Sequence, residues 1–97
     1  MKPSEALKLH REDIRRVVEQ CDARNPRIFG SVAHGDDTEE SDLDLLVDPI
    51  SGKTTFISLI RIQRALRDLL GVPVDVQTPG SLSERFREKV LAEAVPV

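Results

Sequence analysis

The sequence has 97 residues, the length of one small domain, and carries a net charge of −3. Aromatic residues make up only 3%, with no Trp and no Tyr. These values argue against a strong grip on a nucleic-acid backbone and against base stacking on aromatic platforms. The single cysteine, Cys21, excludes an internal disulfide and a cysteine-based zinc site. With no apolar run of signal-peptide or membrane-spanning length, we expect a cytoplasmic protein.

The N-terminal segment predicts one helix from Ser4 to about Asp22. Ser4 is suited to cap the helix, and Glu5 suits its first turn. His10 is expected on its surface. The apolar residues share one face at helical spacing: Leu7, Ile14, Val17, Val18 and Cys21.

Two short strands and a turn follow. The segment "ARNP" breaks the helical pattern, and Pro26 to Phe29 is a predicted strand. Residues 30–41 predict a turn, with one helical turn after Ser31. Residues 42–47 predict the second strand, and "DPISG" is a loop.

The second half of the chain alternates again. Thr54 to Leu70 predicts a helix that ends at Gly71 in a left-handed conformation. Residues 72–77 predict a third strand, and Leu82 to about Ala94 a last helix. Strands alternating with helices indicate one α/β-type layered domain over residues 1–97. The expected buried stripe of the long helix is Phe56, Leu59, Ile60, Gln63, Leu66, Leu69 and Leu70.

The second strand carries closely spaced carboxylates. Because side chains alternate along a strand, Leu43, Leu45 and Val47 share one face, and Asp42 and Asp44 lie on the other. Two carboxylates about 7 Å apart converge readily on divalent cations, and Mg²⁺ prefers such oxygen ligands. The alternative is a solvated strand face, which is how we interpret Asp48 beside the turn at Pro49.

Asp75 is a third candidate in its own valine-rich strand. It points away from Val74 and Val76, as Asp42 and Asp44 point away from the apolar face of theirs. If the two strands lie side by side, the three carboxylates share one surface. Three carboxylates suit a two-metal site that clamps the attacking and leaving oxygens of a phosphoryl-type displacement.

Gly30 and Ser31 directly follow the first strand. Glycine allows a phosphate to approach the backbone closely, and successive N–H groups of a turn form an anion site. The Ser31 hydroxyl adds a further hydrogen-bonding group, and Gly35 releases the turn. Taken alone, Gly-Ser is also an ordinary loop.

Together these residues resemble a known pattern. Gly30-Ser31, ten residues, and Asp42-x-Asp44 match the signature of DNA polymerase β-like nucleotidyltransferases. Further similar stretches are "RIFGS", "LLGVPVDVQT" and "LSERFREKVLAEAVPV". The whole chain resembles a minimal nucleotidyltransferase (MNT) domain, the antitoxin half of HEPN/MNT toxin–antitoxin pairs. The resemblance implies a short mixed β-sheet packed with helices.

The resemblance also implies roles for the matching residues. Gly30 and Ser31 would hold the triphosphate of ATP, Asp42 and Asp44 would bind Mg²⁺, and Asp75 would be the third carboxylate, with two ions in all. Members transfer AMP from ATP to a tyrosine of a HEPN ribonuclease toxin and silence it. Others neutralise the toxin by binding alone, and this alternative stays open.

Three further features bear on this hypothesis. His34 stands where relatives often have Arg; it is expected to be an exposed loop residue, or a weaker phosphate contact. The chain has no length for a second, acceptor-holding domain, so a macromolecular partner is expected to supply the acceptor. The charged helix face of "RIQRALRD" is either a partner surface or simply solvated.

Overall fold

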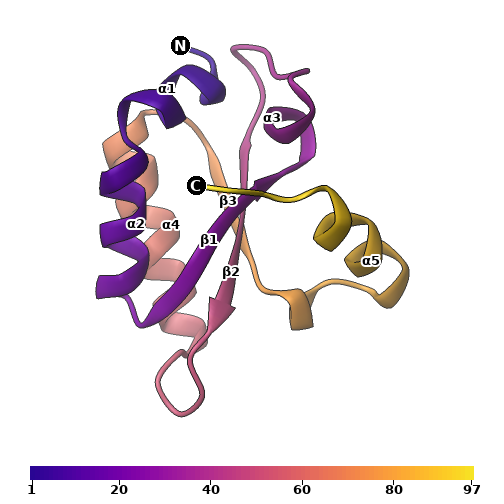
Figure 1. The fold of residues 1–97 in the computed structure, drawn as a ribbon. Helices are drawn as coiled ribbons and strands as arrows, with labels where there is room; N and C mark the ends of the chain where they lie inside the picture. The colour runs from indigo at the N-terminus through magenta and orange to yellow at the C-terminus, as the bar shows by residue number, and fades with distance from the viewer.

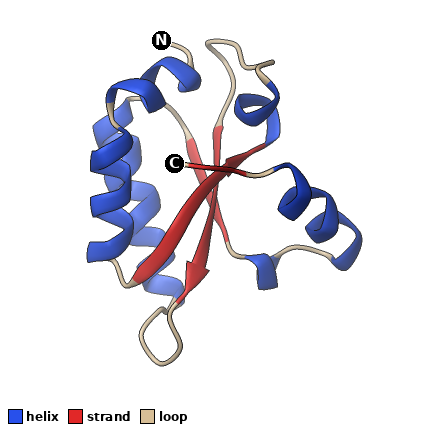
Figure 2. Cartoon of the chain, in the orientation of Figure 1, coloured by secondary structure: helices blue, strands red, loops and turns tan.

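The computed structural model describes residues 1–97 and places a four-stranded sheet between two groups of helices (Figures 1 and 2). Helices α1, α2 and α4 cover one face, and α5 lies on the other side of the sheet. The elements are α1 Pro3–Leu9, α2 Arg11–Gln20, β1 Ala23–Phe29, α3 Gly30–His34, β2 Leu43–Pro49, α4 Phe56–Leu70, β3 Val74–Gln77, the 3₁₀ turn η1 Pro79–Ser81, α5 Glu84–Glu93 and β4 Val95–Pro96.

The sheet is mixed, with strand order β3-β2-β1-β4. β1 pairs antiparallel with β2 and with β4, whereas β2 pairs parallel with β3 through the α4 crossover. The expected mixed sheet with helices packed on it is therefore confirmed. β3 and β4 are the edge strands.

The alternation predicted for β2 and β3 assigns their side chains to the faces of the sheet on which the structure places them. Leu43, Leu45 and Val47 are buried in the main core, against Ile62 and Leu66 of α4. The opposite face carries the polar residues of both strands and a smaller apolar cluster: Phe29, Leu46, Leu82 and Val90. This smaller cluster attaches α5 to the sheet and leaves room beside it.

The N-terminal region contains two helices, where the sequence predicts one. The helix breaks at His10, whose φ of −130° and ψ of 24° are not helical. Ser4 is not the cap residue. Pro3, which lacks an N–H, occupies the first helical position, and the N–H of Ser4 donates to Asp37 Oδ2 at 2.9 Å. The capping oxygen thus comes from 33 residues further along the chain.

Asp37 is buried, and its pKa reflects this contact. Burial raises the pKa of the carboxyl, but hydrogen bonds from Ser4 and from its own backbone N–H, together with the charge of Lys2, outweigh burial and hold the pKa below its ordinary value.

β1 begins at Ala23, three residues before its predicted start. Its pairing with β2 is interrupted between Arg24 and Arg27. The "ARNP" segment therefore belongs to the strand and forms a bulge in it, where the sequence predicts only a break after the helix. Asn25 adopts a positive φ of 54°, a conformation that asparagine tolerates better than most residues.

The buried stripe of α4 differs from the predicted one. The buried positions are four residues apart, at Ser58, Ile62, Leu66 and Leu70. Leu59 and Leu69 pack against the core only in part, and Phe56 and Ile60 are exposed. The helix begins after Thr55, whose hydroxyl accepts the Ser58 N–H, and it ends at Gly71 with φ of 68°, as expected.

Other boundaries shift by a few residues. The strands expected at residues 42 and 72 begin at Leu43 and Val74, and the last helix begins at Glu84. η1 and β4 were not predicted. β4 consists of two residues held on β1, where Val97 N–H donates to the Pro26 carbonyl at 3.0 Å.

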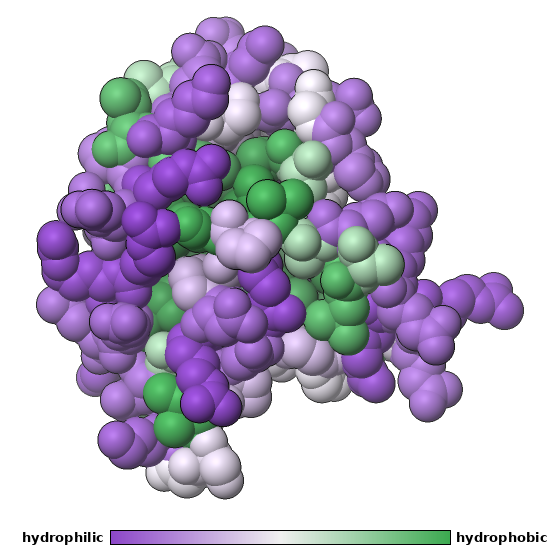
Figure 3. All heavy atoms as spheres, viewed as in Figure 1, coloured by the Kyte–Doolittle hydropathy of each residue, from purple (hydrophilic) through white to green (hydrophobic).

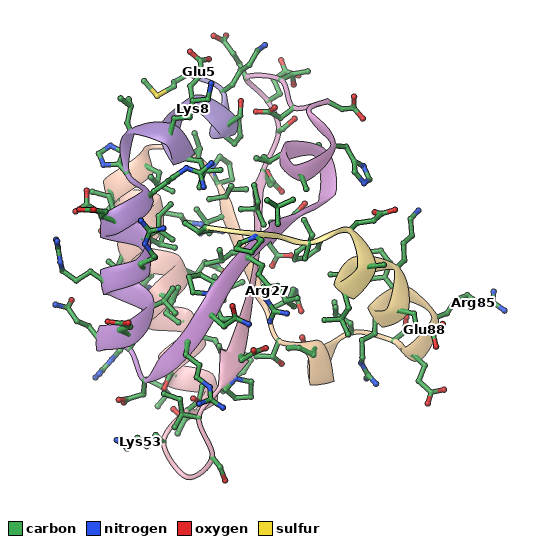
Figure 4. All side chains as sticks on the ribbon, in the orientation of Figure 1. Glu5, Lys8, Arg27, Lys53, Arg85 and Glu88 are labelled. Carbon is green, nitrogen blue, oxygen red and sulfur yellow. The ribbon has the colours of Figure 1, made fainter.

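The face shown in Figure 3 is largely hydrophilic, with the largest group of apolar side chains near its middle and smaller groups at its left edge. Arg85 and Glu88 project from α5 away from the sheet, and Lys53 extends from the loop between β2 and α4 (Figure 4). None of the helices has the length and apolar character that crossing a bilayer requires.

Candidate active site

Parallel pairing of β2 and β3 brings two of the predicted carboxylates together. Asp44 and Asp75 are direct partners in the register, on strands about 4.8 Å apart, and both point to the α5 side. Asp42 lies one residue before β2 and is exposed. Its charge raises the pKa of Asp44, so it lies close enough to act on that residue.

These carboxylates lack basic partners, which distinguishes them from their neighbour on the same strand. Asp48 forms an ion pair with Arg27, whose side chain is mostly buried. No ion pair reaches Asp42, Asp44 or Asp75. Asp48 is thus ion-paired and only partly exposed, where the sequence predicts a simply solvated side chain, and its charge is compensated outside the acidic group.

The uncompensated charge affects the pKa of Asp44. Burial first, and then the charges of Asp75 and Asp42, raise its pKa from 3.8 to about 6. A group in this state favours a bound cation, because the cation removes both the repulsion and the cost of burial.

Gly30 lies directly against Asp44. Phe29, the residue before it, is the register partner of Asp44, and Gly30 has φ of 71°. A Cβ at this position would overlap Asp44 Oδ2 and lie 3.2 Å from its Cγ. Glycine is thus required here for two reasons, the left-handed backbone and the nearby carboxylate. Ser31 continues into the single helical turn α3 that the sequence predicts.

A cavity of about 380 Å³ opens in front of Asp44 and Asp75, within the range of small-molecule sites. A smaller cavity of about 170 Å³ lies beside it, next to Gly30 and His34. Phe29 and Phe86 line both cavities. The other residues that line the larger cavity are Gln77, Ser81, Leu82 and Ser83.

Three residues of this cavity were not predicted to belong to the site: Gln77, Ser81 and Phe86. Gln77 Nε2 lies 3.2 Å from both carboxylate oxygens of Asp75, and Ser81 Oγ donates to Gln77 Oε1 at 2.7 Å. This chain of hydrogen bonds holds the Asp75 carboxylate in place. Gln77 is two residues after Asp75, so strand alternation alone could have placed it in the site.

His34 is half-exposed, as expected, but it lies at the end of α3 and not in an open loop. Its Nε2 is 2.8 Å from Glu93 Oε2, so it links α3 to the end of α5. His10 lies on the surface side of the helix break, 3.1 Å from Asp13.

The donor set fits Mg²⁺ without forming a complete cage. No three His, Cys, Asp or Glu side chains converge closely enough to hold a metal ion by themselves. Mg²⁺ needs only one or two protein carboxylates, because water and substrate phosphates complete its shell. Asp44 and Asp75, adjacent and without a basic partner, meet that requirement.

The family follows from a match over most of the chain. The family model described as "Polymerase beta, Nucleotidyltransferase" matches residues 12–97. The chain belongs to this family and is a nucleotidyltransferase. The resemblance to minimal nucleotidyltransferases is confirmed as well: a solved structure assigned to that class is 42% identical, with a TM-score of 0.86, over 97% of this chain and 95% of that one.

Two other comparisons point the same way. The protein adenylyltransferase MntA of Thermococcus cleftensis is 33% identical over 94% of this chain and 88% of its own length. A toxin–antitoxin crystal structure with AMP-PNP has the same fold, with a TM-score of 0.74, 20% identity, and coverage of 88% of this chain and 69% of that one.

Proposed function

We propose that this chain is an antitoxin that transfers AMP from ATP to a hydroxyl of a cognate HEPN ribonuclease toxin, most simply a tyrosine. The observation that carries the proposal is the placement of Asp44 and Asp75 beside Gly30, with no basic partner, at the mouth of a cavity. We further propose that residues 1–97 act as one domain, in a reducing cytoplasm that suits the free Cys21.

The chemistry is an in-line displacement at the α-phosphorus. The acceptor oxygen attacks that phosphorus, the bond to the oxygen bridging to the β-phosphorus breaks, and pyrophosphate leaves with the bonding electron pair. In this proposal Asp75 accepts the proton of the hydroxyl, and Gln77 holds its carboxylate in position. The backbone of Gly30 and Ser31 cradles the triphosphate, and Phe86 offers an apolar surface for the base.

The metal requirement is also part of the proposal. Asp42, Asp44 and Asp75 would hold Mg²⁺, with two ions the expected number. When bound, Mg²⁺ neutralises phosphate charge and orients the triphosphate. Because Asp44 and Asp75 are register partners, the carboxylates that would hold the ion and the carboxylate that accepts the proton belong to the same small surface.

The test uses this protein at catalytic ratio to the toxin. The candidate toxin is a small helical protein with an Arg-x₄-His motif, to be sought in the neighbouring reading frame, and the mixture contains α-labelled ATP and Mg²⁺. The toxin should gain label and one or more AMP units of mass, and it should stay silent after separation, because a phosphodiester persists on dilution whereas masking by binding reverses.

The Asp42→Asn/Asp44→Asn double variant separates enzyme from binder. It should fail at catalytic ratio, although it still inhibits at equimolar ratio if contact alone contributes. If the double variant protects as well as wild type at every ratio, and the mass of the toxin never changes, neutralisation is by stoichiometric binding.

A further inference from the structure

The outward face of α4 carries apolar side chains that no part of the chain covers. Phe56 is 78% exposed and Ile57 is 62% exposed, and Ile60 is exposed as well. They lie within the first five residues of the helix, whereas the buried positions follow another face. Clustered large apolar side chains on a surface are typical of contact sites for other molecules.

These side chains border a groove that leads to the active site. The groove has a volume of about 280 Å³ and lies between α4 and the second half of β3. Because β3 is an edge strand, no further strand closes this side of the sheet. Three residues line both the groove and the cavity described above: Asp75, Gln77 and Ser81. The groove is therefore continuous with the site of chemistry.

The order of the strands indicates which reactant binds in the groove. Across the sheet, the Gly30 turn at the end of β1 comes first, then Asp44 on β2, then Asp75 on β3, and then the groove. In an in-line displacement the attacking oxygen approaches the phosphorus opposite the leaving group. With pyrophosphate held at the Gly30 turn, the acceptor hydroxyl enters from the β3 edge.

The chemistry of the groove also favours the acceptor over the nucleotide. Four of its lining residues are apolar, and no basic side chain is among them: Phe56, Leu59, Ile60, Gln63, Asp75, Val76, Gln77 and Ser81. A triphosphate would find no basic side chain to bind in this groove. A protein segment with apolar side chains binds favourably there, because it buries them against Phe56 and Ile60.

We propose that this groove docks the acceptor segment of the partner protein, through apolar side chains next to the modified hydroxyl in its sequence. This rests on the proposed function. Acidic side chains beside the hydroxyl would gain no ion pair from the groove, since no basic side chain lines it.

The test compares Phe56→Ser and Ile60→Ser with Leu9→Ser, a matched control that is 66% exposed on α1, away from the groove. The probe is the candidate toxin protein used in the transfer assay above. For each groove variant, KM for the toxin should rise about tenfold while kcat changes less than about twofold. Calorimetric affinity for Mg²⁺ with AMP-PNP, and the melting temperature, should stay at wild-type values. Leu9→Ser should behave as wild type throughout.

The measurements separate docking in the groove from the transfer reaction itself. If wild type modifies the toxin and the groove variants keep its KM, the groove does not dock the acceptor. If wild type modifies nothing, toxin affinity without nucleotide decides: loss in Phe56→Ser but not in Leu9→Ser supports the groove, and equal affinities overturn it. A wild-type dimer in sedimentation that Phe56→Ser dissociates, with toxin affinity unchanged, assigns the face to a second copy instead.

Discussion

Gly30→Ala tests the close contact between the phosphate turn and the acidic strand, and Gly35→Ala is its matched control. Both glycines have a positive φ, 71° and 75°, so alanine pays a similar backbone cost at each. That cost is about 1–2 kcal/mol, offset in part by the stiffer unfolded chain. Only at Gly30 does the new Cβ meet another group, the Asp44 carboxylate, since nothing lies within 4 Å at Gly35.

The extra cost at Gly30 follows from what must move. Asp44 has to leave its rotamer, which adds about 1 kcal/mol. Gly35→Ala should therefore lower the melting temperature by about 5 °C and Gly30→Ala by about 10 °C. The larger difference is functional, because the displaced carboxylate no longer lies beside Asp75. Affinity for AMP-PNP with Mg²⁺ should fall at least about tenfold in Gly30→Ala and stay near wild type in Gly35→Ala.

The assay is thermal unfolding followed by calorimetric titration with AMP-PNP and Mg²⁺ on the folded variants. Equal affinity in the two variants would contradict a role of this contact in nucleotide binding. In that case the contact between Gly30 and Asp44 would serve only the packing of the turn.

Asp44→Asn should raise the melting temperature at pH 8 in metal-free buffer. In a separate assay with Mg²⁺ present, it should abolish AMP transfer. A carboxyl whose folded pKa is raised to about 6 lowers the stability above that pH, and the loss disappears as the pH falls toward 4. Partial exposure of Asp44 limits the loss to about 1–2 kcal/mol. If Asp44→Asn does not raise the melting temperature at pH 8, the charge on Asp44 does not destabilise the fold. Asp48→Asn should cost about 1 kcal/mol in denaturant unfolding, because it leaves the guanidinium of Arg27 without its partner, yet transfer rates should not change. Ile62→Ala should cost about 2–5 kcal/mol, since its side chain is fully buried, and Phe56→Ala should cost almost nothing; the reverse ranking would restore the buried stripe expected from the sequence.

The strands and the positions of the candidate site residues were the most predictable parts of the chain, because side chains alternate between the two faces of a strand. The alternation in residues 42–47 and 72–77 fixes which side chains face the core, and the burial of Leu43, Leu45 and Val74 agrees with it. Once the core-facing side chains are known, the carboxylates between them must lie on the opposite face of the sheet. What alternation leaves open is whether the strands are neighbours, and the parallel pairing of β2 with β3 supplies that.

The helices were predicted less well, because tertiary contacts override their local pattern. The apolar spacing from Leu7 to Val18 continues through His10, where the helix in fact breaks. Nothing local marks that break, and the partner of the first turn, Asp37, lies far along the chain. In α4, the apolar residues outnumber the positions that the core accepts, so sequence alone could not decide which of them stay outside.

The contact between Asp37 and Ser4 has a consequence for the opening motions of the molecule. α1 has seven residues, too few to be stable as a helix by itself. When it frays, Asp37 loses the donor that compensates its burial, and the segment from α3 to β2 loses its anchor. The N-terminal helix and the connection leading into Asp42 therefore form one cooperative unit, and their amide protons should exchange with solvent at a common free energy of opening. Residues distant in sequence should thus share a single local stability, and loss of the hydrogen bond from the Ser4 N–H to Asp37 should loosen the connection that leads into Asp42.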